Sequence, residues 1–146
     1  MFFQNGEKLK PEDIQFSFDV YKKLDLVTPS ISSYFDGISS VEVLGPLKVK
    51  INFKNSYFKN FEVAATNWIL PKSVYNVKTQ QPNQLVCAGP YLLELYDKNK
   101  IIKLKVFEKY YGHNTNHLKG FNNFQVVDFQ IIKDEDSRIE KLKKSE

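Results

Sequence analysis

Several residue types are scarce in this chain of 146 residues, and each shortage excludes a class of structure or function. Cys87 is the single cysteine, so no disulfide can form within the chain. Arg138 is the single arginine, although the formal net charge is +4. Proteins that read nucleic acid depend on arginine for bidentate contacts to guanine and phosphate. The positive charge therefore indicates a solvated lysine surface, and we expect no nucleic-acid partner.

Long hydrophobic runs and export signals are also missing. No apolar run approaches the ~20 residues that a membrane-spanning helix needs. The first ten residues, MFFQNGEKLK, lack the basic-then-apolar order of a secretory signal peptide. If the parent protein is exported, we expect that its signal was removed or lies outside this chain.

Catalytic motifs are absent as well. The sequence has no G-x-S-x-G elbow, no P-loop and no dinucleotide fingerprint. Ser17, Cys87 and the two histidines have no motif that would order them as nucleophile and base. Cys87 lies between Val86 and Ala88, so we expect a buried and inert thiol. The chain is therefore predicted not to be an enzyme, and no cofactor is expected.

Apolar and aromatic residues are plentiful by contrast. Hydrophobic residues make up 42% of the chain and aromatic residues 14%, which suffices for a core and argues against disorder. The length suits one ordinary domain or part of a larger protein.

The first half predicts a helix, a hairpin and a second helix. Residues 8–24 read as a helix, Pro11 suits its first helical position, and its apolar stripe follows helical spacing. The members of that stripe are Ile14, Phe18, Tyr21 and Leu24. Residues 28–40 are predicted to form a loop with one helical turn near Tyr34. Residues 56–68 predict a short helix that ends before Pro71, and its apolar side comprises Tyr57, Phe58, Phe61 and Ala65.

The hairpin is predicted over residues 41–53, VEVLGPLKVKINF, with its turn at Gly45-Pro46. Apolar and polar residues alternate along its second half, which is the period of a half-buried strand. The predicted core face consists of Leu47, Val49, Ile51 and Phe53. The polar residues 76–84 that follow the second helix mark the internal boundary.

The second half predicts three strands and a helix. Residues 91–96 and 101–106 read as antiparallel strands, with Leu93 and Leu95 on one face and Glu94 and Tyr96 on the other. A polar loop is expected over 109–123 and a third strand over 124–134. Asp134 or Asp136 is expected to cap a final helix, whose apolar side would be Ile139 and Leu142. The fold class is therefore α/β (mixed α+β), with antiparallel sheets and short helices.

His113 and His117 have the i, i+4 spacing of two metal ligands on a helix. The surrounding Gly and Asn residues favour a loop, and no third ligand follows. No metal site is therefore predicted.

Taken in order, the motifs resemble those of the peptide- and nickel-binding family of bacterial extracellular solute-binding proteins, the substrate receptors of ABC importers. Residues 3–17, FQNGEKLKPEDIQFS, are similar to the family's F-x-D-G-x-P-L-T-A-E-D-V-x-F-S, and residues 41–53 to its V-E-V hairpin. I-L-P-K matches residues 69–72. The chain departs from the pattern at Lys10, Cys87, Tyr111 and Ser145.

Later motifs continue the resemblance over nearly the whole chain. Cys87 to Tyr91 stands in place of G-T-G-P-Y, and Tyr110-Tyr111-Gly112 in place of Y-W-x-G. Arg138, Leu142 and Glu146 fall near the positions of R-x-x-x-L-x-x-G-E. Gly89 permits an unusual backbone conformation and Pro90 stiffens the chain, so we expect a structural role for this segment.

The resemblance implies a fragment of a type II periplasmic-binding-protein fold, because members of the family are several times longer. Residues 1–84 would be an accessory subdomain of the first lobe, and residues 85–146 part of the binding lobe. The implied ligand is a peptide or similar small solute held between two lobes. The implied ligand-contacting residues are Ser30, Tyr34, Asn67 and Trp68. The alternative is that Trp68 belongs to the core and Ser30 to an ordinary loop.

The implied parent is a monomer that delivers its ligand to a membrane ABC permease. It would be periplasmic or extracellular and associated with the membrane, for example as a lipoprotein. The fragment alone is not expected to bind ligand. Two other hypotheses stay open at this point: a stand-alone structural or protein-interaction domain, and a lysine-driven nucleic-acid binder whose affinity would fall steeply with salt.

Overall fold

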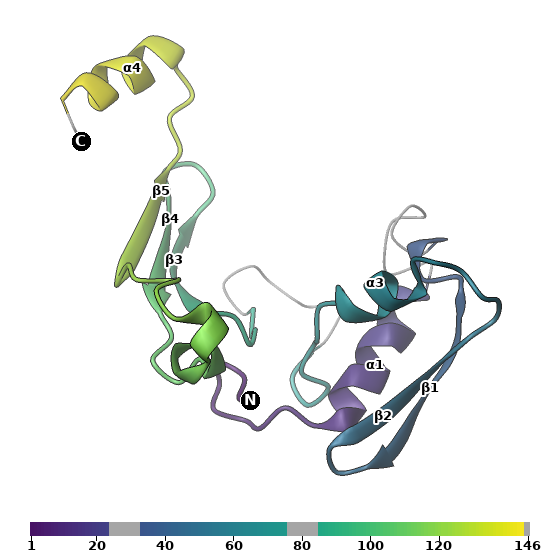
Figure 1. Ribbon diagram of the computed structural model, residues 1–146. Coiled ribbons are helices and arrows are strands. Elements are labelled where there is room, and N and C mark those ends of the chain that lie inside the picture. The colour runs from purple at the N-terminus through teal and green to yellow at the C-terminus, as the bar shows by residue number, and fades with distance from the viewer. Residues whose placement is uncertain (24–32, 76–84, 145–146) are drawn as a thin grey trace. The chain divides into compact units, whose positions relative to one another are not determined.

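The computed structural model describes residues 1–23, 33–75 and 85–144, and they form two compact units. The first unit comprises Met1–Gln80 and Val86–Ala88, and the second comprises Gln81–Leu85 and Gly89–Glu146. Each unit contains an antiparallel sheet and short helices, which confirms the predicted mixed α/β class (Figure 1). No described helix is both long enough and apolar enough to cross a membrane. The roles assigned to residues 1–84 and 85–146 stay predictions.

The first helix, α1 (Pro11–Tyr21), is shorter than predicted. Pro11 is its first residue, and the residue before a proline is driven to extended backbone, as Lys10 shows with φ −118° and ψ 158°. Residues 8–10 therefore cannot join the helix. Phe18 and Tyr21 are buried as expected, whereas Leu24 lies outside the described residues.

The hairpin consists of β1 (Ile38–Gly45) and β2 (Lys48–Phe53), and Figure 1 shows α1 lying against it. β1 begins at Ile38, inside the segment predicted as loop. A bulge between Ile38 and Ser40 keeps both Ile38 and Val41 on the core face, so simple alternation hid this extension. The prediction for Leu47 was wrong: it lies in the turn, beyond the paired strands, and is 90% exposed.

The core of the first unit forms where α1, the hairpin and α3 meet. Its buried members are Phe18, Tyr21, Phe35, Ile38, Val41 and Val63. Partly buried side chains pack around them, namely Ile14, Val49, Ile51, Phe53 and Leu70. The predicted core face of the second hairpin strand is therefore confirmed for Val49, Ile51 and Phe53.

The second helix, α3 (Asn60–Ala65), buries a different face from the one predicted. Val63 is its buried residue, and Phe61, two positions earlier, points away and is 83% exposed. Two residues correspond to about 200° of helical rotation, so both cannot face the core. Tyr57 and Phe58 precede the helix and are exposed.

The second unit is built on β3 (Tyr91–Asp97), β4 (Ile101–Val106) and β5 (Val126–Gln130), in the order β3-β4-β5. Two short 3-10 helices, η2 (Tyr111–Asn114) and η3 (Asn116–Leu118), lie within the predicted loop. α4 (Glu135–Lys143) follows, and the Asp134 carboxylate caps it by accepting from the Ser137 N–H at 2.7 Å. Asp134, and not Asp136, is therefore the cap. Ile139 and Leu142 are exposed.

A bulge in β3 corrects the predicted strand faces. Leu93 pairs with Leu104 and Leu95 with Lys103, so Leu93 and Leu95 face opposite sides. Tyr96, opposite Ile102, joins the face of Leu93. That face carries the apolar side chains Tyr91, Leu93, Tyr96, Ile102, Leu104, Val106, Val127 and Phe129.

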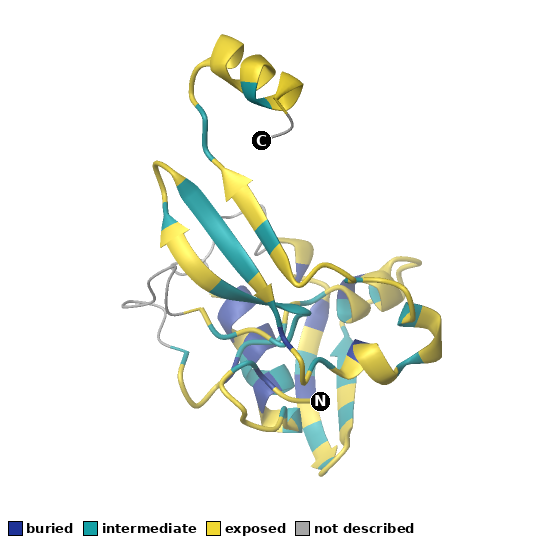
Figure 2. Cartoon of the chain, turned by 90° about the vertical axis from the view of Figure 1, so that its left-hand side faces the viewer, coloured by how far each residue is buried: buried dark blue, intermediate teal, exposed yellow. Residues whose placement is uncertain are grey.

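Burial differs strongly between the units. Figure 2 shows the buried residues mainly in the first unit, whereas the three-stranded sheet has intermediate and exposed residues. Phe107 is the buried apolar side chain among the described residues of the second unit. Among the described residues of the second unit, the apolar face of the sheet is therefore only partly buried.

Cys87 was expected to be buried, but it is exposed. Residues 85–88 form neither helix nor strand, and the carbonyl of Cys87 accepts a hydrogen bond from the Gln4 N–H at 2.8 Å. Partial desolvation by neighbouring atoms still raises the pKa of the thiol above its ordinary value.

Candidate functional site

Residues 67–69 form a short bridge between two anchored positions. At its start, Thr66 ends α3, with its N–H donating to the Glu62 carbonyl at 3.0 Å and its hydroxyl to the same oxygen at 2.9 Å. At its end, the Leu70 N–H donates to Ser17 Oγ at 2.8 Å. The bridge carries Asn67 and Trp68, two of the residues predicted to contact ligand.

The Asn67 amide is a shielded polar group without a partner among the described residues of the first unit. Its Nδ2 and Oδ1 are both shielded from solvent and have no hydrogen-bond partner in the part of the chain that the structure describes. Leaving a buried polar group without a partner costs about 1–3 kcal/mol, and native proteins rarely tolerate it without a reason. The amide has an unused donor and an unused acceptor side by side, and a ligand can pair with them only after the atoms that shield them move aside.

Trp68 follows Asn67 and is 74% exposed, so the alternative that it belongs to the core is wrong. Tyr34 is 44% exposed, and its ring lies edge-on to Phe35 with 5.4 Å between centroids. Phe35 belongs to the same core cluster as Val63 of α3. Tyr34 is therefore linked to α3, which precedes the bridge, through Phe35 and the core cluster. Ser30 lies outside the described residues.

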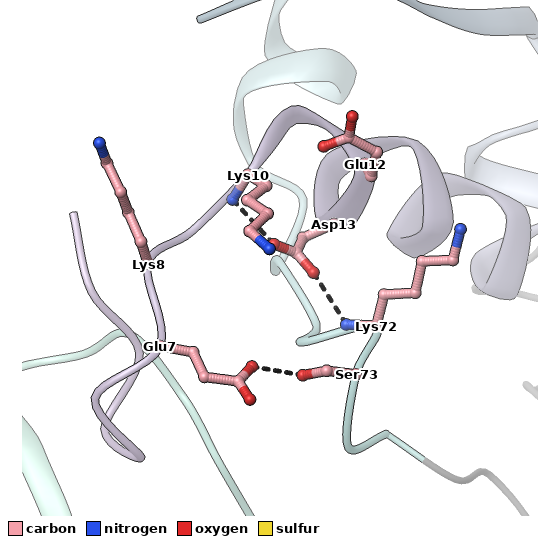
Figure 3. Close-up of a pocket in the computed structure, with 7 residues that line it drawn as sticks. All are labelled: Glu7, Lys8, Lys10, Glu12, Asp13, Lys72 and Ser73. Carbon is pink, nitrogen blue, oxygen red and sulfur yellow. Dashed lines mark hydrogen bonds between the residues drawn. The ribbon is translucent and has the colours of Figure 1, made fainter. Parts of the chain in front are cut away.

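A pocket of about 510 Å³ lies beside the N-terminus of α1 (Figure 3). It is lined by Glu7, Lys8, Lys10, Glu12, Asp13, Lys72 and Ser73. Three lysines balance three carboxylates, and Asp13 already accepts from the backbone N–H groups of Lys10 and Lys72 at 2.8 and 2.9 Å. Glu7 accepts from the Ser73 hydroxyl. The pocket is thus bordered by structural hydrogen bonds and does not contain the predicted ligand residues.

A second pocket, of about 520 Å³, lies in the second unit and includes His113 and the loop residues 118–123. A ring nitrogen of His113, Nε2, is 3.1 Å from the Phe107 carbonyl, so its tautomer with a proton on Nε2 is held by a backbone acceptor. The described residues contain no group of three or more His, Cys, Asp or Glu side chains that could bind a metal. The absence of a metal site stays a prediction.

Tyr21 and Tyr75 supply hydroxyl groups near the core of the first unit. Burial raises the pKa of Tyr21, and the nearby Tyr75 and Cys87 raise it further. Tyr21 therefore remains a neutral core side chain at physiological pH.

Sequence reasoning missed the part played by Asp13 and Ser17. Both are buried although they are polar, and both bind the segment Leu70–Lys72 that follows the bridge. Their spacing of four places them on the same face of α1 as the apolar stripe. Polar residues on the helix face that carries Phe18 and Tyr21 were the sequence signal that could have indicated this role.

Known proteins resemble the chain along its whole length. The model of the bacterial extracellular solute-binding proteins, family 5 Middle, matches residues 1–146. A curated relative from Agrobacterium fabrum, described as "Probable peptide-binding protein YejA", is 21% identical over 150 residues, covering 95% of this chain and 24% of the relative.

Solved structures share the fold. NikZ from Campylobacter jejuni, in complex with Ni(L-His), has a TM-score of 0.81 at 24% identity, covering 99% of this chain and 28% of that protein. AppA from Bacillus subtilis, in complex with a nonapeptide, has a TM-score of 0.77 at 19% identity, and the match covers 98% of this chain and 29% of that protein. The chain thus spans about a quarter of the length of the relatives it matches. Because the family model covers every residue, the chain belongs to the bacterial extracellular solute-binding proteins, family 5.

Proposed function

We propose that the chain is part of the substrate-binding protein of an ABC importer, and that it contributes Asn67 and Trp68 to a site for a peptide or similar small solute. The unpartnered amide of Asn67 is the observation that carries the proposal. Membership of a solute-binding family supports it. So do the neighbours, one of them in complex with a nonapeptide and one with Ni(L-His). The role is binding without catalysis, and the family match does not favour a stand-alone structural domain.

The chemistry of the bridge suits a peptide main chain. A main-chain peptide group presents one N–H donor and one C=O acceptor, and the Asn67 amide has the complementary acceptor and donor. A hydrogen bond to a shielded group gains strength from the low local dielectric. The exposed indole of Trp68 adds a flat apolar face for a side chain or an aliphatic segment. Ser30 and Tyr34 complete the proposed set of contacts.

The proposal extends to a longer parent. Residues 1–84 would form an accessory subdomain and residues 85–146 part of the first lobe, with a second lobe elsewhere in the parent. Two-lobed receptors close around their ligand by hinge motion, so both lobes supply contacts. We therefore expect this chain alone to bind weakly or not at all. The parent would act outside the cytoplasmic membrane as a membrane-associated monomer and deliver ligand to an ABC permease.

The test starts from the complete reading frame of the gene. The full-length product is purified, and its binding of di- to pentapeptides and of Ni(L-His) is measured by calorimetry, beside this chain alone. We expect peptide binding by the parent and a loss of at least about tenfold in affinity for Asn67→Ala and for Trp68→Ala. Phe61→Ala, which removes another exposed aromatic ring from the same unit, is the matched control and should change little.

Three results would contradict the proposal. One is a parent that binds none of these ligands, and another is unchanged affinity in both bridge variants. The third is micromolar peptide binding by this chain alone, which would show that no second lobe is needed.

A further inference from the structure

We propose that Asp13 and Ser17 are positioning residues, which hold the bridge of Asn67 and Trp68 in its binding geometry. The inference rests on the proposed function for the role of the bridge. The contacts themselves belong to the first unit and involve no ligand.

The two side chains bind every backbone donor of Leu70-Pro71-Lys72. Ser17 Oγ accepts from the Leu70 N–H at 2.8 Å, and the Asp13 Oδ1 accepts from the Lys72 N–H at 2.9 Å. Pro71, between them, has no N–H to donate and is among the most deeply buried side chains. Three consecutive residues are therefore fixed against α1 without an unpaired donor.

Asp13 and Ser17 are themselves held in place. Ser17 is completely buried, and its hydroxyl donates to the Asp13 carbonyl at 2.6 Å. The second carboxylate oxygen of Asp13 accepts from the Lys10 N–H at 2.8 Å, at the start of α1 (Figure 3). A carboxylate that accepts from two backbone N–H groups makes charge-assisted bonds, which are stronger than neutral ones.

The hydrogen bonds of Thr66 and Leu70 flank the bridge and therefore restrict its backbone. Thr66 fixes the start of the bridge through Glu62, and Ser17 fixes its end at Leu70, so three residues span two fixed points. A segment this short has few conformations left when both ends are held. Binding groups need support from surrounding hydrogen bonds, because a loosely held group loses affinity even when it is present.

The alternative is that the bonds only stabilise the fold. Gln15 provides the matched control, because it lies on the same helix between the two residues. Its Nε2 donates to the Val41 carbonyl of β1 at 2.7 Å. The backbone donors of the Leu70–Lys72 segment bind Ser17 and Asp13 instead. Gln15→Ala therefore removes a helix-to-hairpin bond, whereas Ser17→Ala removes the bond to the end of the bridge at Leu70. Asp13→Asn replaces one of two carboxylate acceptors by an amide donor, so one of the bonds from the Lys10 and Lys72 N–H groups is lost.

Trp68 provides the readout, because it is the single tryptophan of the chain. In time-resolved fluorescence anisotropy of the ligand-free 146-residue chain, the tryptophan signal comes from Trp68 alone. The fast component of its decay reports the local motion of the indole, and the slow component reports overall rotation. We expect Ser17→Ala and Asp13→Asn to enlarge the fast component of the anisotropy decay, and Gln15→Ala to leave it as in the wild type. The variants are compared well below their melting temperatures, and far-UV circular dichroism shows that each is folded. Asp13→Asn keeps the side-chain shape and serves if Ser17→Ala fails to fold.

Peptide affinity of the full-length parent is the second measurement. We expect it to fall roughly tenfold in Ser17→Ala and Asp13→Asn and less than about twofold in Gln15→Ala. An unchanged Trp68 decay in both variants overturns the positioning role, even if the parent binds peptide. An equal change in Gln15→Ala also overturns it, because the effect would then come from general loosening. If the full-length parent binds no peptide but Trp68 gains motion in the Ser17 and Asp13 variants, the proposed function is rejected. The inference that Asp13 and Ser17 position the bridge is then still supported.

Discussion

Ile51→Lys is expected to destabilise the first unit severely, whereas Lys50→Ile, one position away, is expected to be nearly neutral. Ile51 pairs with Val41, which is 7% exposed, and packs against the core cluster. Lys50 pairs with Glu42 on the opposite face of the hairpin, and both residues are exposed. No carboxylate from the hairpin strands lies on the face of Ile51.

The expected magnitude follows from burial. Fully burying an isoleucine side chain stabilises a protein by about 1.5–3 kcal/mol, and Ile51 is partly buried, so its loss accounts for about 1 kcal/mol. An ammonium group placed against this cluster without a partner adds roughly 1–3 kcal/mol. Lys50→Ile removes an exposed charge that lies opposite Glu42 in the strand register, an arrangement worth less than about 1 kcal/mol, and it gains strand propensity. We therefore expect the free energy of unfolding to fall by about 2–4 kcal/mol in Ile51→Lys and by less than about 0.5 kcal/mol in Lys50→Ile.

Thermal unfolding followed by far-UV circular dichroism separates the two variants. For a unit of this size, the larger loss corresponds to a melting temperature lower by about 10 °C or more. The double variant, Ile51→Lys with Lys50→Ile, has the composition and net charge of the wild type and should melt like Ile51→Lys alone. Equal melting temperatures for the two single variants would refute the assignment of the strand faces and the location of the core.

Two further predictions concern the second unit. Replacing His113 and His117 by Ala should remove the contact to the Phe107 carbonyl and cost about 0.5–1.5 kcal/mol. That loss should be the same with and without zinc or nickel in a melting experiment, so a metal-dependent stabilisation that the double variant lacks would restore the metal hypothesis. Hydrogen bonds from Ser137, first its side chain and then its backbone N–H, hold the pKa of Asp134 below its ordinary value of 3.8. The cap should therefore stabilise α4 fully above that pH and lose its effect as the pH falls through the lower folded pKa. Asp134→Asn, also a good capping residue, should remove this pH dependence, as an NMR titration of the Ser137 amide can show. A cap that weakens as the pH rises from 4 to 7 would contradict the assignment of the ionised Asp134 carboxylate as the cap of α4.

Local sequence patterns determined the elements that depend on neighbouring residues. Pro11 at a helix start and the alternation through Val49, Ile51 and Phe53 were predicted and confirmed. The same holds for the strand from Ile101 to Val106 and for Asp134 as one of two expected caps. Each feature arises from backbone restriction or from side-chain period over a few residues, so no distant contact is needed to form it. The hairpin turn was predicted one residue too early, because Gly45 still pairs with Lys48 and the turn consists of Pro46 and Leu47.

Errors arose where a bulge or a helix boundary shifted the period. One extra residue in β3 moved Tyr96 to the face of Leu93 and Leu95 to the other, because side chains alternate strictly along a strand. In α3, the late start at Asn60 left Tyr57 and Phe58 outside the helix and made Val63 the buried residue. Bulges and boundaries depend on strand pairing and packing, which a single sequence does not display.

The candidate site shows the same division. The resemblance of the motifs nominated Asn67 and Trp68 from sequence, but only the tertiary structure showed that the Asn67 amide is shielded and unpartnered and that the indole is exposed. Ser17 and Leu70 are 53 positions apart, and Asp13 and Lys72 are 59 apart. Hydrogen bonds between such distant residues exist only after α1 and α3 have packed on the hairpin core. The sequence determines which polar groups are available, and the fold decides which of them pair with each other and which remain without a partner.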